Sequence, residues 1–587
     1  MVRAMHHRGP DAHGTRTFQT DAGRQATLGA VRLRIIDVAP TADQPMSDAT
    51  GSVWTVFNGE LYNFKELRAE LSAMGYAFRT SSDTECLVHL YDYLDGDVAR
   101  IASRLRGMFA FAIWDNTRGR LVAARDRLGI KPFHWTPTPH GFAFCSEQRG
   151  LAAAGLIDGA PNLDAIAGYL AKGVVANGQN ILRDAQHLNP GEALIWDGGK
   201  PITERWWRPV LTTRADLLPR ERAQAHVTAS VTDAVARHLV ADRAVGVFLS
   251  SGTDSAAIAT LAAQSGAQRS LTVRFPDEPA LDEGDAAAAT AAHLGFDHIE
   301  VPVTGRDAAE LMPAFLQSLD SPTADGFNNW LVCRAAREAG LVVVLSGVGG
   351  DELFAGYRTF RQVPWLRAIS PVISRLPSTA RRVSAHALRR RPQTRQLARA
   401  FSAAPGSAGA YHAIRRIFDD AEIEGVGLAK PRLLGLASDP GGIDAVTLLE
   451  LESYLRDQLL PDADTTSMSH SLELRVPLLD DKVVDAALAL PMSMRTHGKQ
   501  LLATAAGLGE RPPKRTFTLP LEHWLAGPLR DTLRDALLDD TLPFADVLPT
   551  TFRQRLWTEY ELGRAHWNKA WSVAVLRMWP GANGLAA

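Results

Sequence analysis

The sequence predicts two domains: an N-terminal α+β domain of antiparallel strands, and a C-terminal α/β domain with a parallel sheet. The chain has 587 residues, more than a single hydrophobic core usually organises. Short apolar runs separated by turn residues fill the first part, whereas apolar strands alternate with helical segments after residue 223. A stretch rich in Pro and Gly at 189–219 separates the two patterns. We expect domains at 1–195 and 223–587, joined by a linker at 196–222.

The strands of each domain follow from local patterns. In the first domain they are expected at 27–36, 52–57, 108–114, 120–124 and 141–145, with helices at 63–74 and 83–94. In the second they are expected at 245–249, 271–275, 298–303 and 341–345, with helices between them. Such alternation predicts a parallel sheet with helices on both faces, which binds ligands at the carboxyl ends of its strands.

Composition narrows the function classes. Hydrophobic residues make up 46% and charged residues 22% of the chain, and the net charge is −2. This balance is typical of a globular protein and provides no overall field for nucleic acid or an acidic membrane surface. The basic run at 381–399 is interpreted as a solvated helix face, with a nucleic-acid contact as the alternative. We therefore expect small-molecule partners, no nucleic acid and no membrane.

Cysteine usage and hydropathy indicate a cytoplasmic protein. The three cysteines, Cys86, Cys145 and Cys333, are too few for a disulfide framework and suit a reducing compartment. No apolar run approaches the roughly 20 residues needed to cross a bilayer. The first residues show no signal-peptide pattern.

The strand at 245–249 ends abruptly in Ser250-Ser251-Gly252-Thr253-Asp254-Ser255, and an alanine-rich helical segment follows. Unpaired backbone N–H groups and the helix dipole at such a junction attract phosphate, and Gly252 permits a close approach. The loop lacks the lysine of a P-loop, and its alternative interpretation is an ordinary serine-glycine turn. The order of residues resembles the pyrophosphate loop of the N-type ATP pyrophosphatases, which activate a carboxylate or carbonyl by adenylylation.

A second glycine loop follows the strand at 341–345 and reads Ser346-Gly347-Val348-Gly349-Gly350-Asp351-Glu352. By the resemblance, Asp254 and Asp351 share Mg²⁺ and Lys499 supplies an ammonium to the phosphates. Glu352 is a catalytic candidate, and its alternative role is to complement a helix dipole. The ATP-binding residues that the resemblance implies are Leu249, Ser250, Ser251, Gly252, Thr253, Asp254, Ser255, Val273, Ser346 and Gly347.

The first domain carries its own series of motifs. They include His7-Arg8-Gly9-Pro10, Asn58-Gly59-Glu60-Leu61-Tyr62, Ser82-Asp83-Thr84-Glu85 and Arg125-Asp126-Arg127-Leu128-Gly129. Together they resemble the class II glutamine amidotransferase domain of the asparagine synthetase family, which implies an Ntn-hydrolase-like β-sandwich flanked by helices. The resemblance assigns Arg32 to the glutamine carboxylate, Asn58 and Gly59 to the oxyanion hole, and Glu60 and Asp83 to the substrate amino group. A guanidinium suits a carboxylate and a carboxylate suits an ammonium, so these assignments are physically sound.

The chain departs from the family at the nucleophile. The family's N-terminal cysteine, in a Met-Cys-Gly start followed by a strand, is replaced here by Met1-Val2-Arg3. Cys86 and Cys145 are each interpreted as small core residues. Two explanations stay open: a misplaced start or trimmed sequence, and a protein that uses free ammonia. As written, the chain is not expected to hydrolyse glutamine.

A second departure lies in the second glycine loop. Asparagine synthetases commonly carry glutamate where this chain has Val348, and valine can neither accept a proton nor bind a cation. That favours relatives that make other amides. The segment 358–440 carries no recognised motif, whereas 462–480 and 514–521 match the family's later landmarks, with Glu473 and Arg475 interpreted as structural charges.

The sequence thus predicts an ATP- and Mg²⁺-dependent ligase that adenylates a carboxylate, aspartate first, releases pyrophosphate and transfers ammonia. Alternatives are an amidotransferase or cyclase acting on a sugar, a peptide or a β-amino acid, and a non-catalytic nucleotide-binding descendant. The resemblance leaves a homodimer open as the assembly.

Overall fold

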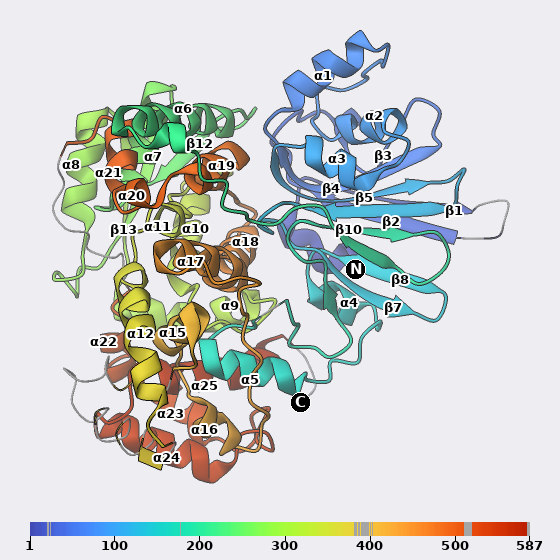
Figure 1. Cartoon of the computed structure of the whole chain (residues 1–587). Coiled ribbons are helices and arrows are strands. Elements are labelled where there is room, and N and C mark those ends of the chain that lie inside the picture. The colour runs from blue at the N-terminus through green and yellow to red at the C-terminus, as the bar shows by residue number, and fades with distance from the viewer. Residues whose placement is uncertain are drawn as a thin grey trace.

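The computed structural model describes residues 1–19, 23, 25–176, 178–377, 379–380, 384, 388, 398, 401, 403–509 and 519–583. Two domains lie side by side: strands and short helices from the first third of the chain, and a larger helical and parallel-sheet body from the rest (Figure 1). Among the described residues, no helix is both long and apolar enough to cross a membrane.

The N-terminal domain is built mainly of short antiparallel strands. Its strands are β1 (Ala12–Gln19), β2 (Gln25–Arg32), β3 (Met46–Ser47), β4 (Val53–Leu61), β5 (Gly107–Asp115), β6 (Arg120–Arg125), β7 (His134–Thr138), β8 (Gly141–Cys145), β9 (Gln186–His187), β10 (Glu192–Trp196) and β11 (Ile202–Arg205). Its helices are η1 (Val2–Arg8), η2 (Pro40–Ala42), α1 (Phe64–Ala73), α2 (Glu85–Tyr93), α3 (Val98–Arg104) and α4 (Gln148–Ala153), whereas α5 (Leu163–Lys172) packs against the C-terminal body (Figure 1). Of these, η1 and η2 are 3₁₀-helices.

The strands of this domain form a six-stranded sheet in the order β11-β10-β6-β5-β4-β3, the hairpin β1-β2, and a three-stranded sheet β8-β7-β9. Alternation along β5 sorts its side chains to opposite faces. Phe109 and Phe111 join the core beneath α1–α3, whereas Ala112 and Trp114 join the core shared with Phe18 and Phe133. The predicted antiparallel sandwich flanked by helices is confirmed.

The C-terminal domain alternates strands and helices. Its strands are β12 (Val245–Phe248), β13 (Arg269–Arg274), β14 (Asp297–Pro302), β15 (Val343–Leu345) and β16 (Glu473–Arg475). Its helices up to residue 424 are η3 (Ala215–Leu217), α6 (Arg220–His238), α7 (Thr253–Gln264), α8 (Gly284–Leu294), α9 (Gly305–Ser318), α10 (Phe327–Glu338), α11 (Gly350–Leu353), α12 (Thr359–Ser374), α15 (Gly406–Arg415) and α16 (Asp420–Glu424). Those that follow are α17 (Gly442–Leu449), η5 (Glu450–Leu459), α18 (Leu460–Met468), η6 (Pro477–Leu479), α19 (Asp481–Ala489), α20 (Met492–Arg495), α21 (Gly498–Ala505), α22 (Leu521–Ala526), α23 (Arg530–Leu538), α24 (Thr550–Glu561) and α25 (Trp567–Ala582).

The five C-terminal strands run parallel in the order β14-β13-β12-β15-β16. From β12 the chain builds outward to one edge, then returns and places β15 on the other side of β12. Right-handed crossovers consequently put α7 and α8 on one face and α10 on the other. The predicted parallel α/β domain is confirmed, and the switch point between β12 and β15 is where such a sheet binds ligands.

The domains are joined by buried ion pairs. Arg106 of the first domain contacts Asp480 at 2.7 Å and Asp233 at 2.6 Å, and the Asp480 side chain is fully buried. Lys131 reaches Asp464 at 3.2 Å. Because the Asp480 and Asp464 carboxylates are withdrawn from water, each needs its partner from the other domain, whereas Asp233 is 44% exposed.

The structure differs from the predicted elements in both domains, and in the first domain the strands β1, β3, β7, β9, β10 and β11 were not predicted. The strand expected at 27–36 ends at Arg32, because the guanidinium of Arg32 binds the carbonyl oxygens of Ile36 and Asp37 and turns the chain. The fifth strand, β16, was not predicted, since three residues are too few to show a period. Most of the basic run 381–399 and residues 514–518 of the last landmark lie outside the described residues.

Arg106→Ala should destabilise the protein because it leaves the fully buried Asp480 without its cation. We expect the free energy of unfolding, measured by urea titration, to fall by about 3 kcal/mol. Arg306→Ala is the matched control, because Arg306 and its partner Glu310 are 89% and 64% exposed. Equal losses in the two variants would contradict a buried interdomain pair.

Candidate active site

Two loops meet at the switch point of the parallel sheet. The first, 249–252, connects β12 to α7, and the second, 346–349, connects β15 to α11. Because β12 and β15 are adjacent and parallel, their carboxyl ends lie at the same edge. The sequence-predicted ATP loop and its companion are therefore neighbours in space.

The first loop is held by its own hydroxyl groups. The Ser250 and Ser255 hydroxyls lie 2.8 Å apart, and the Gly252 N–H donates to the Ser250 hydroxyl at 3.2 Å. Leu249 is buried and its N–H donates to the Leu271 carbonyl at 2.9 Å. Ser251, Thr253 and Asp254 are half-buried at the start of α7. The loop thus presents polar groups at a helix N-terminus, the environment in which phosphate binds.

The two loops are in close contact. A Cβ at Gly350 would lie 2.4 Å from the Asp254 Cγ, so only glycine fits there. A Cβ at Gly347 would lie 3.0 Å from the Cβ of the same aspartate. The Ser346 N–H donates to the Arg475 carbonyl at 2.9 Å, which fixes this loop to β16. Val273 is buried on the adjacent strand β13.

Lys499 from α21 brings a cation to both loops. Its Nζ lies 2.6 Å from the Asp254 Oδ2 and 2.7 Å from the Asp351 Oδ1. Burial by itself would lower the pKa of this lysine, but the two carboxylates raise it above its usual value. The three residues named from distant parts of the sequence therefore form one charged cluster, which we call the Asp-Lys-Asp cluster.

The donor set of this cluster suits Mg²⁺. Asp254 and Asp351 already converge on one cation, and Mg²⁺ typically takes one or two carboxylates together with substrate phosphates. Among the described residues, no group of three or more His, Cys, Asp or Glu side chains could hold a metal by itself. A metal here would therefore depend on the nucleotide for its remaining ligands.

Glu352 and Val348 differ in their surroundings. Glu352 is buried and accepts a hydrogen bond from the Tyr357 hydroxyl at 2.6 Å. Burial raises the pKa of Glu352 to about 7, although the Tyr357 hydrogen bond opposes this shift. Val348 is half-buried and packs against the apolar core of the domain. Glu352 can therefore exchange a proton beside the Asp-Lys-Asp cluster, whereas Val348 cannot.

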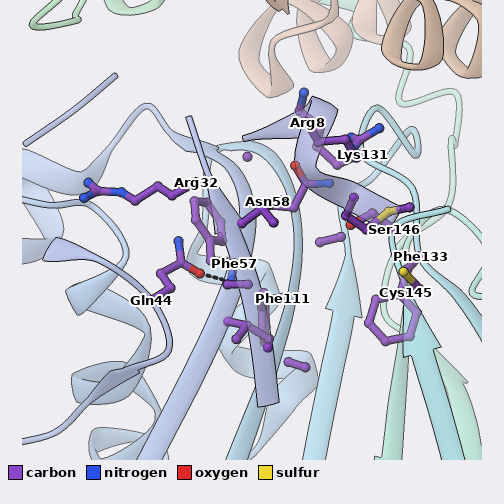
Figure 2. A pocket seen from close by; sticks show the side chains of 18 of the residues that line it. Arg8, Arg32, Gln44, Phe57, Asn58, Phe111, Lys131, Phe133, Cys145 and Ser146 are labelled. Carbon is purple, nitrogen blue, oxygen red and sulfur yellow. Dashed lines mark hydrogen bonds between the residues drawn. The ribbon is translucent and has the colours of Figure 1, made fainter. Parts of the chain in front are cut away.

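A second site lies in the N-terminal domain, where a cavity of about 430 Å³ opens between the sheets. Figure 2 shows Arg8, Asn58 and Lys131 near one end, and aromatic rings of β4, β5 and the segment before β7 below them. The cavity is lined by all five residues that the sequence predicts to bind glutamine, which are Arg32, Asn58, Gly59, Glu60 and Asp83.

These five residues are held in different ways. The guanidinium of Arg32 binds Asp43 at 3.0 Å besides the nearby backbone carbonyls. Gly59 has φ +141°, and a Cβ there would lie 1.9 Å from the Met108 carbonyl oxygen, so glycine is required. The Asn58 Nδ2 is buried and has no hydrogen-bond partner among the described residues. Burial raises the pKa of Asp83, which accepts from the Leu61 N–H at 3.0 Å.

Glu60 connects the cavity with the other domain. Its Oε1 lies 3.2 Å from the Nη2 of Arg475, which is fully buried and also binds Glu473 at 2.7 Å. Burial and the nearby Glu473 raise the pKa of Glu60 well above its usual value. In this arrangement Glu60 faces a guanidinium of the C-terminal domain, and Arg475 touches both sites through its side chain and its carbonyl.

A thiol also lines the cavity. Cys145 lies at the end of β8 and is nearly buried, and burial raises the pKa of its thiol to about 11. A thiol with so high a pKa is almost entirely protonated at neutral pH and is a poor nucleophile. Sequence reasoning named Glu352 as a catalytic candidate, but it missed the Tyr357 hydroxyl that binds this carboxylate and it missed Lys131 on the cavity wall. The only sequence signal for Tyr357 and Lys131 was that each lies beside a motif.

The chain matches known families over nearly its whole length. A family model described as "Glutamine amidotransferase domain" matches residues 1–207, and one described as "Asparagine synthase" matches residues 226–580. Asparagine synthetase (glutamine-hydrolyzing) 1 of Bacillus subtilis strain 168 is 30% identical, over 99% of this chain and 93% of that protein. Asparagine synthetase (glutamine-hydrolyzing) 3 of the same organism is 27% identical, over 80% of this chain and 75% of that protein. A solved structure of glutamine phosphoribosylpyrophosphate amidotransferase from B. subtilis covers 51% of this chain and 61% of its own, with 19% identity and a TM-score of 0.27.

The raised pKa of Glu352 should make stability depend on pH. Because the folded protein favours the protonated acid, the contribution of Glu352 is complete below its unfolded pKa and is lost as the pH rises towards 7. Glu352→Gln cannot ionise, so it should gain roughly 3 kcal/mol relative to the unsubstituted protein between pH 4.5 and 8. Urea titrations across this range would measure the gain, with the exposed Glu221→Gln as control. A parallel pH dependence in Glu352→Gln and the unsubstituted protein would contradict the assigned pKa.

Proposed function

The chain belongs to the asparagine synthetase family of ATP-dependent amide-forming ligases, and we propose that it activates aspartate as an acyl-AMP and converts it to the amide. The Asp-Lys-Asp cluster is the observation that carries this proposal. It places two carboxylates and an ammonium between two phosphate-suited loops, and a pyrophosphate-releasing site needs these groups.

Each group has a role in the proposed reaction. The hydroxyl and N–H groups of the first loop, with Ser346 and Gly347 of the second, bind the phosphates, and Leu249 and Val273 support the nucleotide base. The Lys499 ammonium exchanges its carboxylate partners for phosphate oxygens when ATP binds. When bound, Mg²⁺ held by Asp254 and Asp351 supplies charge neutralisation for the pyrophosphate.

The bond changes follow from this placement. An oxygen of the substrate carboxylate attacks the α-phosphorus, and the bond to the bridging oxygen of pyrophosphate breaks. Ammonia then attacks the carbonyl carbon of the acyl-AMP, and AMP leaves. The attacking nitrogen becomes positively charged and must lose one proton to give the amide. Glu352, with its pKa of about 7, is suited to accept that proton at neutral pH.

Val348 favours a second candidate substrate. An apolar side chain in the catalytic loop packs against the core and offers the substrate no charge. A carboxylate on a sugar, a peptide or a β-amino acid would not require an ionisable group there, so these acids are the alternative acceptors.

The source of ammonia is the other open part of the proposal. The cavity retains Arg32, Asn58, Gly59, Glu60 and Asp83, but its thiol, Cys145, is kept protonated by burial. We propose that this chain takes ammonia from solution and that its glutaminase half is inactive.

Pyrophosphate release from ATP and Mg²⁺ should require a carboxylate and the Asp-Lys-Asp cluster. Asp351→Asn and Lys499→Met should each lower the rate roughly a hundredfold, because each removes a charge from the developing pyrophosphate. Lys482→Ala changes an exposed lysine and should leave the rate unchanged. Pyrophosphate release at an unchanged rate in Asp351→Asn, or pyrophosphate release without a substrate carboxylate, would contradict the proposal.

Amide formation should be supported by ammonium chloride and not by glutamine. Product would be followed by mass spectrometry with ¹⁵N-ammonium or with glutamine labelled at its amide nitrogen. Cys145→Ala should leave both results unchanged, since that thiol is not a nucleophile. Transfer of label from glutamine, lost in Cys145→Ala, would show that the cavity is a working glutaminase.

A further inference from the structure

Helix α12 (Thr359–Ser374) lies on the outside of the C-terminal domain, shortly after the second glycine loop and α11 (Figure 1). Its inner face is apolar and buried, because Phe360, Val363, Leu366 and Ile373 join a core cluster with residues of α15 and α17. A helix of 16 residues is about 24 Å long, so the opposite face of α12 forms a long exposed surface.

This outer face combines arginines with large apolar side chains. Arg358, Arg361, Trp365, Val372 and Leu376 follow one another at intervals of three, four or seven residues, which places them along one side of the helix. The helical turn continues as far as Leu376, whose N–H donates to the carbonyl three residues earlier at 3.1 Å. Trp365 is 44%, Val372 67% and Leu376 43% exposed, and both arginines are exposed as well. We call these five residues the α12 stripe.

A row of exposed apolar side chains distinguishes α12 from the rest of the described chain. The other large apolar residues that are exposed there occur singly, for example Leu163 on α5, Ile202 on β11 and Leu562 after α24. Single exposed apolar residues need no explanation, whereas a contiguous group of them marks a surface that meets another apolar surface. The outer face of α12 is therefore suited to a partner and not to water alone.

The arginines of the stripe have no acidic partners. Helix α12 contains no Asp or Glu, and the side chains of Arg358 and Arg361 form no ion pair with any residue that the structure describes. By contrast, the exposed Arg306 on α9 is paired along its own helix with Glu310 at 3.1 Å. Two positive charges are consequently available beside the three apolar side chains of the stripe.

Charge is segregated over this part of the sequence. Between Glu352 and Asp419 the chain has thirteen arginines and no Asp, Glu or Lys. The net charge of −2, from which we expected no membrane partner, averages this basic stretch with an acidic remainder. The local field around α12 is therefore positive, and it attracts an anionic surface within about a Debye length.

An anionic partner for this surface is nucleic acid, an acidic protein or a bilayer that contains anionic lipid. Nucleic acid offers phosphates to the arginines but no apolar environment for Val372 and Leu376. A specific protein interface usually buries about 800 Å² on each partner, more than one row of five side chains provides. A bilayer surface offers lipid phosphates to the arginines and the edge of the acyl region to the apolar residues, and it requires no complementary shape.

We propose that the α12 stripe docks on an anionic phospholipid surface, with the axis of α12 in the plane of the bilayer. Arg358 and Arg361 meet lipid phosphates, and Trp365, Val372 and Leu376 enter the boundary between headgroups and acyl chains. This peripheral attachment does not depend on the reaction proposed above. It holds the second glycine loop close to the lipid surface, because only residues 354–358 separate α11 from α12.

Sedimentation with lipid vesicles tests the proposal without any measurement of turnover. The unsubstituted protein should bind vesicles of phosphatidylcholine with about 40% phosphatidylglycerol at least about tenfold more strongly than vesicles of phosphatidylcholine alone. Raising the NaCl concentration from about 0.05 M to about 0.5 M should weaken this binding roughly tenfold, because salt screens the arginines. Equal binding to the two kinds of vesicle, or binding to neither, would overturn the proposal.

Two double variants separate the two contributions to binding. Arg358→Glu with Arg361→Glu should reduce binding to the level seen with phosphatidylcholine alone. Trp365→Ser with Val372→Ser should weaken binding to the anionic vesicles roughly tenfold and leave its salt dependence unchanged. Retention of full binding by both double variants would show that another part of the chain meets the vesicle, and would overturn the assignment to α12.

Matched controls carry the same kinds of change elsewhere. Arg220→Glu alters an exposed arginine of α6 that has no ion pair within the described part of the chain, and Ile202→Ser alters a residue that is 64% exposed. Both should bind the anionic vesicles as the unsubstituted protein does, and thermal unfolding should be similar in all variants. A loss of binding in these controls equal to that in the stripe variants would contradict a specific role for α12.

Quenching of tryptophan fluorescence gives a readout that needs no loss of binding. Lipids brominated on their acyl chains should quench the unsubstituted protein more than Trp365→Phe, since the proposal places the Trp365 ring at the acyl boundary. Equal quenching in the two proteins would contradict that placement. Binding of DNA, or formation of a dimer, that is lost in the stripe variants while vesicles are not bound would assign the stripe to nucleic acid or to a second copy of the chain, and would overturn the proposal.

Discussion

The arrangement of the catalytic domain depends on the position of one ammonium group between two carboxylates. Lys499 reaches Asp254 and Asp351 from α21, although the three residues are far apart in the chain. Without Lys499 the carboxylates of Asp254 and Asp351 would repel each other, and a lysine that contacted only one of them would hold only one of the two loops. The parallel sheet makes the meeting possible, because β12 and β15 are neighbours and end at the same edge. Both glycine loops, and the phosphate chemistry assigned to them, follow from that adjacency.

The second constraint is the interface between the two domains. Arg475 is fully buried, contacts Glu60 of the glutamine cavity at 3.2 Å, and accepts the Ser346 N–H on its carbonyl at 2.9 Å. One residue therefore touches the wall of the first cavity and the backbone of the second glycine loop. Arg106 and Lys131 add further ion pairs across the same boundary. Because breaking such pairs exposes unpaired charges, the two domains are expected to keep a fixed relation.

Much of this arrangement was predictable from the sequence, and the reasons for the misses are physical. Strand-loop-helix order in 245–264 and 341–353 predicted the two loops, and parallel topology then predicted their meeting. Lys499 was identified only through the resemblance to the ATP pyrophosphatases, since nothing in the local sequence distinguishes it from a solvated lysine. The contacts of Arg415 with Tyr357 and Glu450 were not predicted, because the three residues meet only in three dimensions and no sequence period links them. For the same reason the sequence analysis assigned Glu60 to the amino group of glutamine but did not show that Glu60 contacts Arg475.

The central claim is that a carboxylate oxygen attacks the α-phosphorus of ATP at the Asp-Lys-Asp cluster. The most direct measurement is the fate of ¹⁸O from a labelled substrate carboxylate, with aspartate as the first acid, after turnover with ATP, Mg²⁺ and ammonium. The account expects one ¹⁸O in AMP and none in pyrophosphate, read by mass spectrometry. Label in inorganic phosphate together with ADP would show attack at the γ-phosphorus instead. That result would contradict the assignment of both loops.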